Sequence, residues 1–285
     1  MIEAGVLHAL HEHQNILCMS HVNPDGDAYG SLLGIGWMLR HLGKQPVLAM
    51  HDKTPPEFLA LPGSADIIGP DQLGNTYDLV IILDTSSLDR VGTVYRQEWQ
   101  GEIPLLVIDH HITNTRFGDI NWVAPECAAT CQMLVELADA LAIPLTGKLA
   151  ECLLTGVTTD TLCFRTSNTT STVLEVAARL MRGGGDLVFI TQHLLNQRSY
   201  SLFKLWSMVF SHIALEEGVI WTTISREEMS RAGDQNQDGQ LSSMLITAVE
   251  AEISATFTER VDDQGRQFVD CSFRARPGFD VASTA

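Results

Sequence analysis

The sequence is poor in basic residues. It contains 18 Lys and Arg against 35 Asp and Glu, which gives a formal net charge of −17 at pH 7. Proteins that hold long DNA usually carry a basic stripe, because contacts with phosphates dominate their affinity. The sequence has no such stripe, so we expect no binding of long duplex DNA, and a nucleic-acid substrate would have to be short. Much of the acidity is typical of a solvated surface.

Long apolar runs are also missing. The apolar residues 34–37 are followed closely by Arg40, His41 and Lys44, and no stretch approaches the ~20 residues that a membrane-spanning helix needs. The N-terminal segment lacks the basic residues and the apolar run of a secretory signal. We therefore expect a cytoplasmic protein without a membrane partner, and the sequence leaves a homodimer open.

Cysteine pairs of the C-x-x-C type are absent. The sequence has six cysteines, most of them inside apolar segments. This usage is typical of buried, reduced thiols rather than of disulfides or a structural zinc site. Cys127 and Cys131 are one helical turn apart, so a metal pair at these two thiols is the alternative interpretation.

The chain is long and apolar enough for a sizeable core. With 285 residues, 45% of them hydrophobic, it should form one large or two modest domains. Apolar runs without polar alternation predict strands buried on both faces of a sheet, at 16–20, 46–50, 79–83 and 105–108. Helical periodicity is found at 28–42, 128–141, 147–159 and 170–181. This alternation predicts an α/β fold with a mainly parallel, doubly wound sheet.

The pattern changes after the three glycines at 183–185. No Lys-Ser or Lys-Thr follows them, so they predict a helix end or a hinge rather than a phosphate loop. A helical connector is expected over 187–210. Strands at 213–215, 219–225, 252–258 and 268–273, with helices at 226–232 and 241–248, then predict a smaller α+β domain. The expected organisation is a first domain at 1–186, a linker at 187–210 and a second domain at 211–285.

Residues 234–239 copy the start of an EF-hand calcium loop. The twelfth position of that loop falls on Leu245, where a bidentate Glu is required. We predict a polar loop there and no calcium site.

Four groups of polar residues follow apolar segments. His21, Asp25 and Asp27 come after 16–20, Asp84 closes 79–83, the triplet Asp109, His110 and His111 closes 105–108, and Asp160 follows 153–159. In open α/β sheets, ligands bind beyond the carboxyl ends of the strands. Three of the four groups should therefore meet at one edge of the sheet.

Such a meeting point would combine several carboxylates with at least two imidazoles. Like charges at close range repel one another, and divalent cations remove that repulsion. Oxygen and imidazole ligands without thiolate suit Mn²⁺ or Mg²⁺ better than a structural zinc, and two such ions can activate water for displacement at phosphorus. Taken singly, Asp25 and Asp27 also suit a turn and a helix N-cap, and a lone Asp84 suits a cap.

The order H-x-x-x-D-x-D, D, D-H-H, D resembles the DHH phosphoesterase superfamily. The flanking segments HVNPDGDAYGS, VIILDTSSLDRVG, LLVIDHHITN and TGVTTDTLCFRTSNTT look like that family's motifs. VDCSFRAR resembles the arginine-bearing strand of the DHH-associated domain. Among subgroups, the sequence looks most like the stand-alone nanoRNase and pAp-phosphatase group.

The resemblance implies two divalent ions, Mn²⁺ with Mg²⁺ or Co²⁺ as alternatives, held by His21, Asp25, Asp27, Asp84, His110 and Asp160. Asp84 would be the ligand that both ions share. The resemblance also implies that His111 faces the substrate and either binds the scissile phosphate or assists proton transfer, while Asp109 orients a histidine. Arg274 and Arg276 would bind a phosphate or a base of the substrate.

The implied activity is hydrolysis of short oligoribonucleotides, pAp or dinucleotides such as pApA and cyclic di-AMP by metal-activated water. Two alternatives stay open: an inorganic pyrophosphatase or exopolyphosphatase, and a nucleotide-binding protein with impaired catalysis. Residues 1–186 would be the DHH catalytic domain and 211–285 the DHH-associated substrate-binding domain. That second domain ordinarily continues into a G-G-G-H loop, and we expect the printed sequence to stop before it; the proposed metal ligands all precede residue 161.

Overall fold

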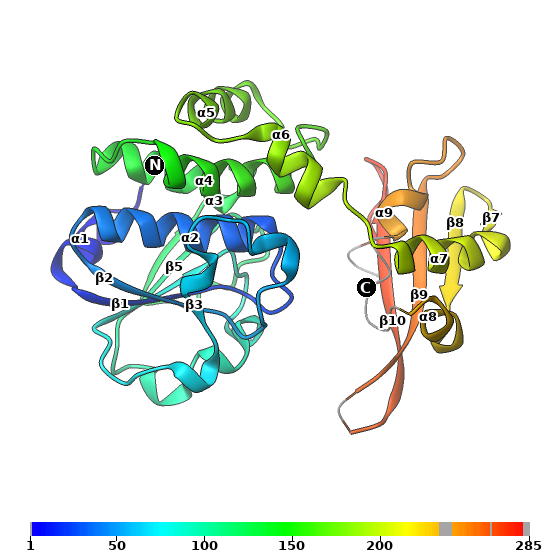
Figure 1. Cartoon of the computed structure of the whole chain (residues 1–285), viewed down its shortest axis with the longest axis horizontal. Helices are drawn as coiled ribbons and strands as arrows, with labels where there is room; N and C mark the ends of the chain where they lie inside the picture. The colour runs from blue at the N-terminus through cyan, green and yellow to red at the C-terminus, as the bar shows by residue number, and fades with distance from the viewer. Residues whose placement is uncertain (1, 234–240, 263, 282–285) are drawn as a thin grey trace. The chain divides into compact units, whose positions relative to one another are not determined.

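The computed structural model describes residues 2–233, 241–262 and 264–281 (Figure 1). The chain divides into two compact units, Met1–Asn196 and Gln197–Ala285. This boundary falls inside the segment 187–210 that the sequence predicts as a linker, so the first ten residues of that segment group with the first unit and the remainder with the second.

The first unit is built on a six-stranded sheet. Its strands are β1 (Asn15–Met19), β2 (Gln45–Ala49), β3 (Ile67–Ile68), β4 (Leu79–Leu83), β5 (Leu105–Asp109) and β6 (Ile120–Val123). They lie in the order β3-β2-β1-β4-β5-β6, and each neighbouring pair is parallel. Every residue of β4 and β5 is buried, because helical segments cover both faces of the sheet. The predicted parallel α/β fold is confirmed.

Side chains alternate between the two faces of the sheet. One face packs against helices, and its core includes Ile16, Ile81 and Leu106. The helices of this unit are α1 (Ala4–Glu12), α2 (Gly26–His41), α3 (Thr130–Ala140), α4 (Gly147–Asp160), α5 (Ser171–Arg182) and α6 (Leu187–Ile190). The other face packs against the short 3-10 segments Leu88–Val94 and Gln97–Trp99. Figure 1 shows α2, α3 and α4 together on one side of the sheet, with α5 beyond α4.

The second unit contains a four-stranded mixed sheet. Its strands are β7 (Ala214–Glu216), β8 (Val219–Ile224), β9 (Ile253–Val261) and β10 (Gln267–Ala275), in the order β10-β9-β8-β7. The β8–β9 pair is parallel and the other two pairs are antiparallel. The helices α7 (Tyr200–Val209), α8 (Arg226–Ala232) and α9 (Leu241–Leu245) contribute to its core. A smaller α+β unit is thus present, as predicted.

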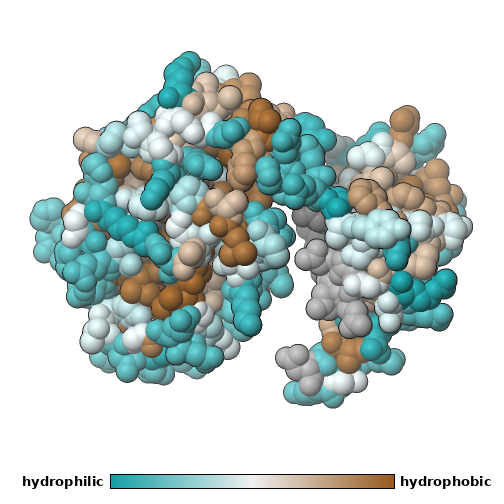
Figure 2. All heavy atoms as spheres, viewed as in Figure 1, coloured by the Kyte–Doolittle hydropathy of each residue, from teal (hydrophilic) through white to brown (hydrophobic). Residues whose placement is uncertain are grey.

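The interpretation of 234–239 as a polar loop lies outside the described residues. Within the described part of the chain, no helix is both long and apolar enough to cross a membrane. On the face shown in Figure 2, hydrophobic residues reach the surface as separate patches between hydrophilic ones.

Candidate metal centre and active site

The predicted polar groups meet at the edge of the sheet where β1, β4 and β5 end. The loops after these strands bring His21, Asp84, His110 and His111 to this edge, and Asp109 is the last residue of β5. Asp160 arrives as the last residue of α4. We call the six residues His21, Asp25, Asp27, Asp84, His110 and Asp160 the acid–histidine cluster.

Asp84 lies at the centre of this cluster. Its side chain is buried, with a relative exposure of 2%, and its backbone N–H donates to the Ile108 carbonyl at 3.0 Å. Its Oδ1 lies 3.5 Å from His110 Nε2 and its Oδ2 lies 3.6 Å from His21 Nε2. The two oxygens of one carboxylate therefore face two different imidazoles.

Asp25 and Asp27 begin α2 and have different environments. Asp25 is the N-cap, and its Oδ1 accepts from the backbone N–H of Asp27 and of Ala28, so its interpretation as a helix cap is correct. Asp27 is fully buried. It accepts from the N–H of Thr130 at 2.6 Å and of Cys131 at 3.0 Å, which places its carboxylate at the positive N-terminal end of α3.

The two cluster histidines are held in one orientation. The Nδ1 of His21 donates to the Val22 carbonyl at 2.9 Å, and the Nδ1 of His110 donates to the Cys127 carbonyl at 3.3 Å. A carbonyl oxygen only accepts, so Nδ1 carries the hydrogen and the lone pair of the neutral ring is on Nε2. His110 Nε2 lies 3.2 Å from Asp160 Oδ2 and 3.9 Å from Asp27 Oδ2. Both imidazoles thus direct a metal-ligating atom at the carboxylates.

Three overlapping sets of possible ligand atoms result. They are His21, Asp25 and Asp84; Asp27, His110 and Asp160; and Asp84, His110 and His111, with the ligand atoms of each set within 4.8 Å of one another. The structure thus brings all six predicted ligands together. Their role as ligands stays a prediction.

The carboxylates of the cluster are crowded and desolvated. Burial, followed by the charge of Asp27, raises the pKa of Asp84 well above its ordinary value. Burial likewise raises the pKa of Asp27, and burial together with Asp27 raises the pKa of Asp160 to about 10. Ionising these groups together requires positive charge close by. Buried carboxylate oxygens beside two Nε2 lone pairs therefore fit divalent cations.

The thiol alternative is disfavoured. Burial raises the pKa of the Cys127 thiol to about 12 and that of Cys131 well above its ordinary value. A protonated thiol is a poor metal ligand, and the Sγ of Cys131 lies 3.9 Å from the backbone oxygen of Asp27. All six cysteines are unpaired, and four of them are buried.

His111 and Asp109 form a pair beside the cluster. The Nδ1 of His111 donates to Asp109 Oδ1 at 2.7 Å, and the His111 side chain is 39% exposed. This hydrogen bond, opposed by burial, raises the pKa of His111. Burial acts to raise the pKa of Asp109, but hydrogen bonds from His111 and Asn114 outweigh it and hold that pKa below its ordinary value. The pair is suited to keep a proton on the imidazole.

Three residues near the cluster had no role in the sequence prediction. Thr130 Oγ1 lies 3.2 Å from Asp84 Oδ1, and Asn114 donates to Asp109. Gly156 allows a close approach, since a Cβ there would lie 2.3 Å from Asp27 Oδ1. The sequence gives only a partial signal for them: Thr130 falls in the first turn of a predicted helix, and Asn114 is three residues after the last histidine of the D-H-H segment.

Arg274 and Arg276 belong to the second unit. Arg274 is in β10, where its Nε lies 3.2 Å from Ser243 Oγ, and Arg276 donates to the Ala248 carbonyl at 2.8 Å. Both side chains are exposed. Their role in substrate binding stays a prediction.

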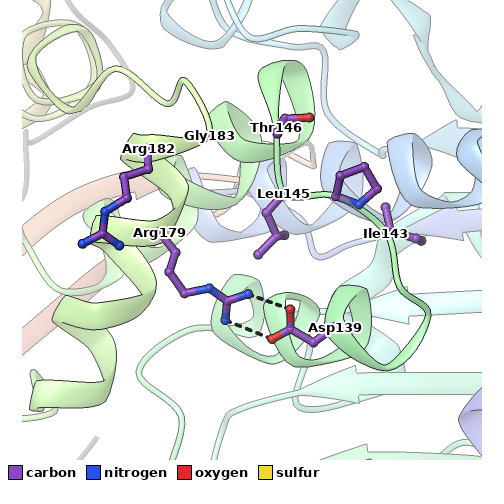
Figure 3. Close-up of a pocket in the computed structure, with 8 residues that line it drawn as sticks. Asp139, Ile143, Leu145, Thr146, Arg179, Arg182 and Gly183 are labelled. Carbon is purple, nitrogen blue, oxygen red and sulfur yellow. Dashed lines mark hydrogen bonds and ion pairs between the residues drawn. The ribbon is translucent and has the colours of Figure 1, made fainter.

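A shallow hollow of about 390 Å³ lies elsewhere on the first unit (Figure 3). It is lined by residues of α3, of α5 and of the connections that follow these two helices, none of which belongs to the acid–histidine cluster. Arg179 faces Asp139 there in a two-bonded ion pair of 2.6 and 2.9 Å. The positive charge of the Arg179 guanidinium is therefore already balanced by the Asp139 carboxylate.

The fold and this edge cluster define an α/β protein with a candidate metal centre at the carboxyl ends of parallel strands. The sequence matches the DHH family, N-terminal domain, over residues 15–157. The chain belongs to the DHH family.

Three relatives whose names state an activity are similar to this chain over most of its length. The bifunctional oligoribonuclease and PAP phosphatase NrnA of Thermus thermophilus is 35% identical over 271 residues, which cover 95% of this chain and 79% of the relative. The protein of the same name from Bacillus subtilis is 29% identical over 78% of this chain and 70% of its own length. The cyclic-di-AMP phosphodiesterase GdpP of Geobacillus thermodenitrificans is 26% identical over 90% of this chain and 41% of its own length.

A solved structure shares the fold. An exopolyphosphatase-related protein from Bacteroides fragilis superposes with a TM-score of 0.87 at 23% identity, covering 96% of this chain and 83% of that one.

Proposed function

We propose that this chain is a hydrolase that cleaves phosphate esters in short oligoribonucleotides, pAp or dinucleotides such as pApA and cyclic di-AMP. The observation that carries the proposal is the meeting of six carboxylate and imidazole side chains around Asp84. The names of the relatives support the substrate class, since they describe oligoribonuclease, PAP phosphatase and cyclic-di-AMP phosphodiesterase activities.

We propose that the cluster holds two divalent ions. His21, Asp25 and Asp84 would hold one, and Asp27, Asp84, His110 and Asp160 the other. Mn²⁺ accepts both carboxylate oxygen and imidazole nitrogen, which supports it over Mg²⁺, while Co²⁺ is a further candidate. When bound, such ions supply charge neutralisation at the phosphate and lower the pKa of water.

His111 would contact the phosphate itself. Asp109 holds its Nδ1, so the exposed side of the ring presents Nε2. The raised pKa of His111 favours a proton on that nitrogen. From Nε2 the proton can be donated in a hydrogen bond to a phosphate oxygen, or transferred to the leaving oxygen as the ester breaks.

The second unit would bind the substrate. We propose that 1–186 is the catalytic DHH domain, 187–210 a helical linker and 211–285 a DHH-associated domain. In the latter, Arg274 and Arg276 would bind a phosphate or a base, for which an exposed guanidinium offers a planar set of donors. Unpaired cysteines support a cytoplasmic setting, and a homodimer stays a prediction.

The direct test is turnover of pApA, pAp and cyclic di-AMP with Mn²⁺ and with a chelator. We expect Mn²⁺-dependent release of nucleotide or phosphate, and loss of activity in Asp84→Asn. The matched control is Asp66→Asn, because Asp66 is an exposed aspartate that pairs with Arg40 at 3.0 Å on the same unit. Turnover of inorganic pyrophosphate or polyphosphate alone would instead favour the inorganic alternative, and nucleotide binding without turnover would favour impaired catalysis.

A further inference from the structure

We infer that Asn114 is a positioning residue for His111, acting through Asp109. This inference rests on the proposed function, in which His111 contacts the phosphate. The buried carboxylate of Asp109 accepts hydrogen bonds from two side chains, the imidazole of His111 and the amide of Asn114.

Each carboxylate oxygen of Asp109 accepts a hydrogen bond from a different side chain. His111 Nδ1 lies 2.7 Å from Oδ1, and Asn114 Nδ2 lies 2.6 Å from Oδ2. Asp109 has a relative exposure of 0%, so water has little access to replace either donor. A buried carboxylate that loses a donor is left with an unsatisfied oxygen, which costs free energy. Asn114 therefore fixes the rotation of the carboxylate that holds His111.

The orientation of the Asn114 amide is unambiguous. Its Nδ2 lies near two acceptors, Asp109 Oδ2 and the Thr85 carbonyl at 2.9 Å, and its Oδ1 accepts from the N–H of Arg116 at 2.7 Å. Exchanging the amide oxygen and nitrogen would set oxygen against two acceptors and nitrogen against a donor. Both amide hydrogens thus have a partner, and one of them is directed at Asp109.

Asn114 also joins the loop of His111 to the loop of Asp84. Thr85, whose carbonyl it binds, directly follows Asp84, and Thr115 N–H donates to the Ser86 carbonyl at 2.9 Å. His111 Nδ1 lies 3.7 Å from Asp84 Oδ1. The position of His111 relative to the acid–histidine cluster therefore depends on this amide.

The expected effect is on alignment rather than on substrate binding. Without the amide, the Asp109 carboxylate can rotate and the His111 ring loses its fixed direction, which lowers the rate of a reaction that depends on geometry. A misplacement of about 1 Å caused by a mutation away from the reacting atoms can cost up to about 100-fold in rate. We expect Asn114→Ala to lower kcat by that factor, with KM and manganese content close to those of the unchanged protein.

The matched control is Asn121→Ala. Asn121 is equally half-buried in the same unit, and its side chain also binds two backbone groups, the N–H and the carbonyl of Gly118, but it makes no contact with Asp109 among the hydrogen bonds described. Asn114→Ser, which keeps a single donor, should lie between the unchanged protein and Asn114→Ala. It also serves as the informative variant if Asn114→Ala does not fold.

A double-mutant cycle separates positioning from a general structural role. If Asn114 acts through His111, Asn114→Ala causes no further loss of kcat in a His111→Ala background. Additive losses, or an equal loss in Asn121→Ala, would overturn the inference.

A readout without catalysis distinguishes this inference from the proposed function. The His111 Nδ1 hydrogen bound to Asp109 should give a downfield proton resonance in NMR spectra of the full chain, identified by its disappearance in His111→Ala. We expect it in the unchanged protein and in Asn121→Ala, and expect it to be lost or shifted in Asn114→Ala. An unchanged resonance in Asn114→Ala would overturn the positioning role, whereas absence of turnover in the unchanged protein would overturn only the proposed function.

Discussion

Asp84 adopts a left-handed backbone conformation, with a φ of 55°. Such a conformation is uncommon for a residue with a Cβ and stores about 1–3 kcal/mol of strain. The strained residue also carries the most crowded carboxylate of the cluster. Strain and repulsion at one residue indicate a site arranged for binding at the expense of stability.

We therefore expect Asp84→Asn to stabilise the chelator-treated protein by about 1 kcal/mol, because it removes a carboxyl group whose burial is unfavourable at neutral pH. The same substitution should abolish the rise in Tm that Mn²⁺ causes in the unchanged protein. Thermal unfolding with and without Mn²⁺ checks both effects. A full Mn²⁺-induced rise in Asp84→Asn would show that the cations bind elsewhere.

The pH dependence of stability follows from the raised pKa values of the buried acids, among them that of Asp160 at about 10. A carboxyl group whose pKa is higher in the folded state stabilises the fold fully below its unfolded pKa of about 4, and this contribution is lost as the pH rises through the folded pKa. We expect the chelated protein to lose stability between about pH 5 and about pH 9, and Mn²⁺ to reduce that loss.

Urea unfolding across this range measures the effect. Asp160→Asn should flatten the profile, while Asp66→Asn should leave its slope unchanged. A chelated protein equally stable at both ends of the range would contradict the buried-charge account.

The sequence predicts the cluster residues well because each follows an apolar segment whose end is visible in the sequence. Asp25 and Asp84 illustrate this. It does not predict the roles of Thr130 and Asn114. Thr130 binds Asp84, which is 46 residues away in the sequence, and Asn114 binds Asp109, which is 5 residues away. The geometry of both hydrogen bonds exists only in the folded chain.

Among the elements, α2 and α4 place the acids at the edge of the sheet. α2 carries Asp27 in its first turn and α4 ends on Asp160. Gly26, Gly30 and Gly34 of α2 lie at helical spacing, and an added Cβ at each would meet atoms of α4 within 3.0 Å. The glycines therefore allow the two helices to approach closely.

Gly30→Ala tests this close packing. The new Cβ would lie 2.6 Å from the Cys152 carbonyl oxygen and 2.9 Å from the Gly156 nitrogen. Both are backbone atoms, so the clash is relieved only if the two helices move apart. We expect a loss of about 2 kcal/mol in the free energy of unfolding and weaker Mn²⁺ binding. Gly69→Ala, where no atom lies within 4 Å, is the control. Equal stability of the two variants in urea would contradict the account.

The elements predicted from the sequence are those with strong burial. The sequence predicts β4 and β5 because each contains a continuous run of buried apolar residues. It does not predict β3 and β6, since β3 has two residues and β6 buries only Trp122 fully. Nor does it predict the helix α1. Short, partly exposed elements at the edge of a sheet owe their structure to neighbours rather than to a pattern of their own.

In the molecule as a whole, charge limits the choice of substrate. With a net charge of −17, the protein would repel a long polyanion, whereas a short one needs to contact only the divalent cations proposed for the acid–histidine cluster. We expect turnover to fall with oligoribonucleotide length beyond a few nucleotides. We also expect no detectable anisotropy change with a duplex of about 30 base pairs at physiological salt. Tight, salt-sensitive duplex binding would contradict this expectation.

The proposed activity depends on one set of side chains around Asp84 that holds two divalent cations. Diffraction from crystals soaked in Mn²⁺, recorded at the manganese absorption edge, tests it most directly. We predict two anomalous peaks per chain, both in contact with the Asp84 carboxylate, and none in crystals of Asp84→Asn. Soaked crystals of the unchanged protein with no peak at Asp84, or with peaks only elsewhere on the molecule, would contradict the claim.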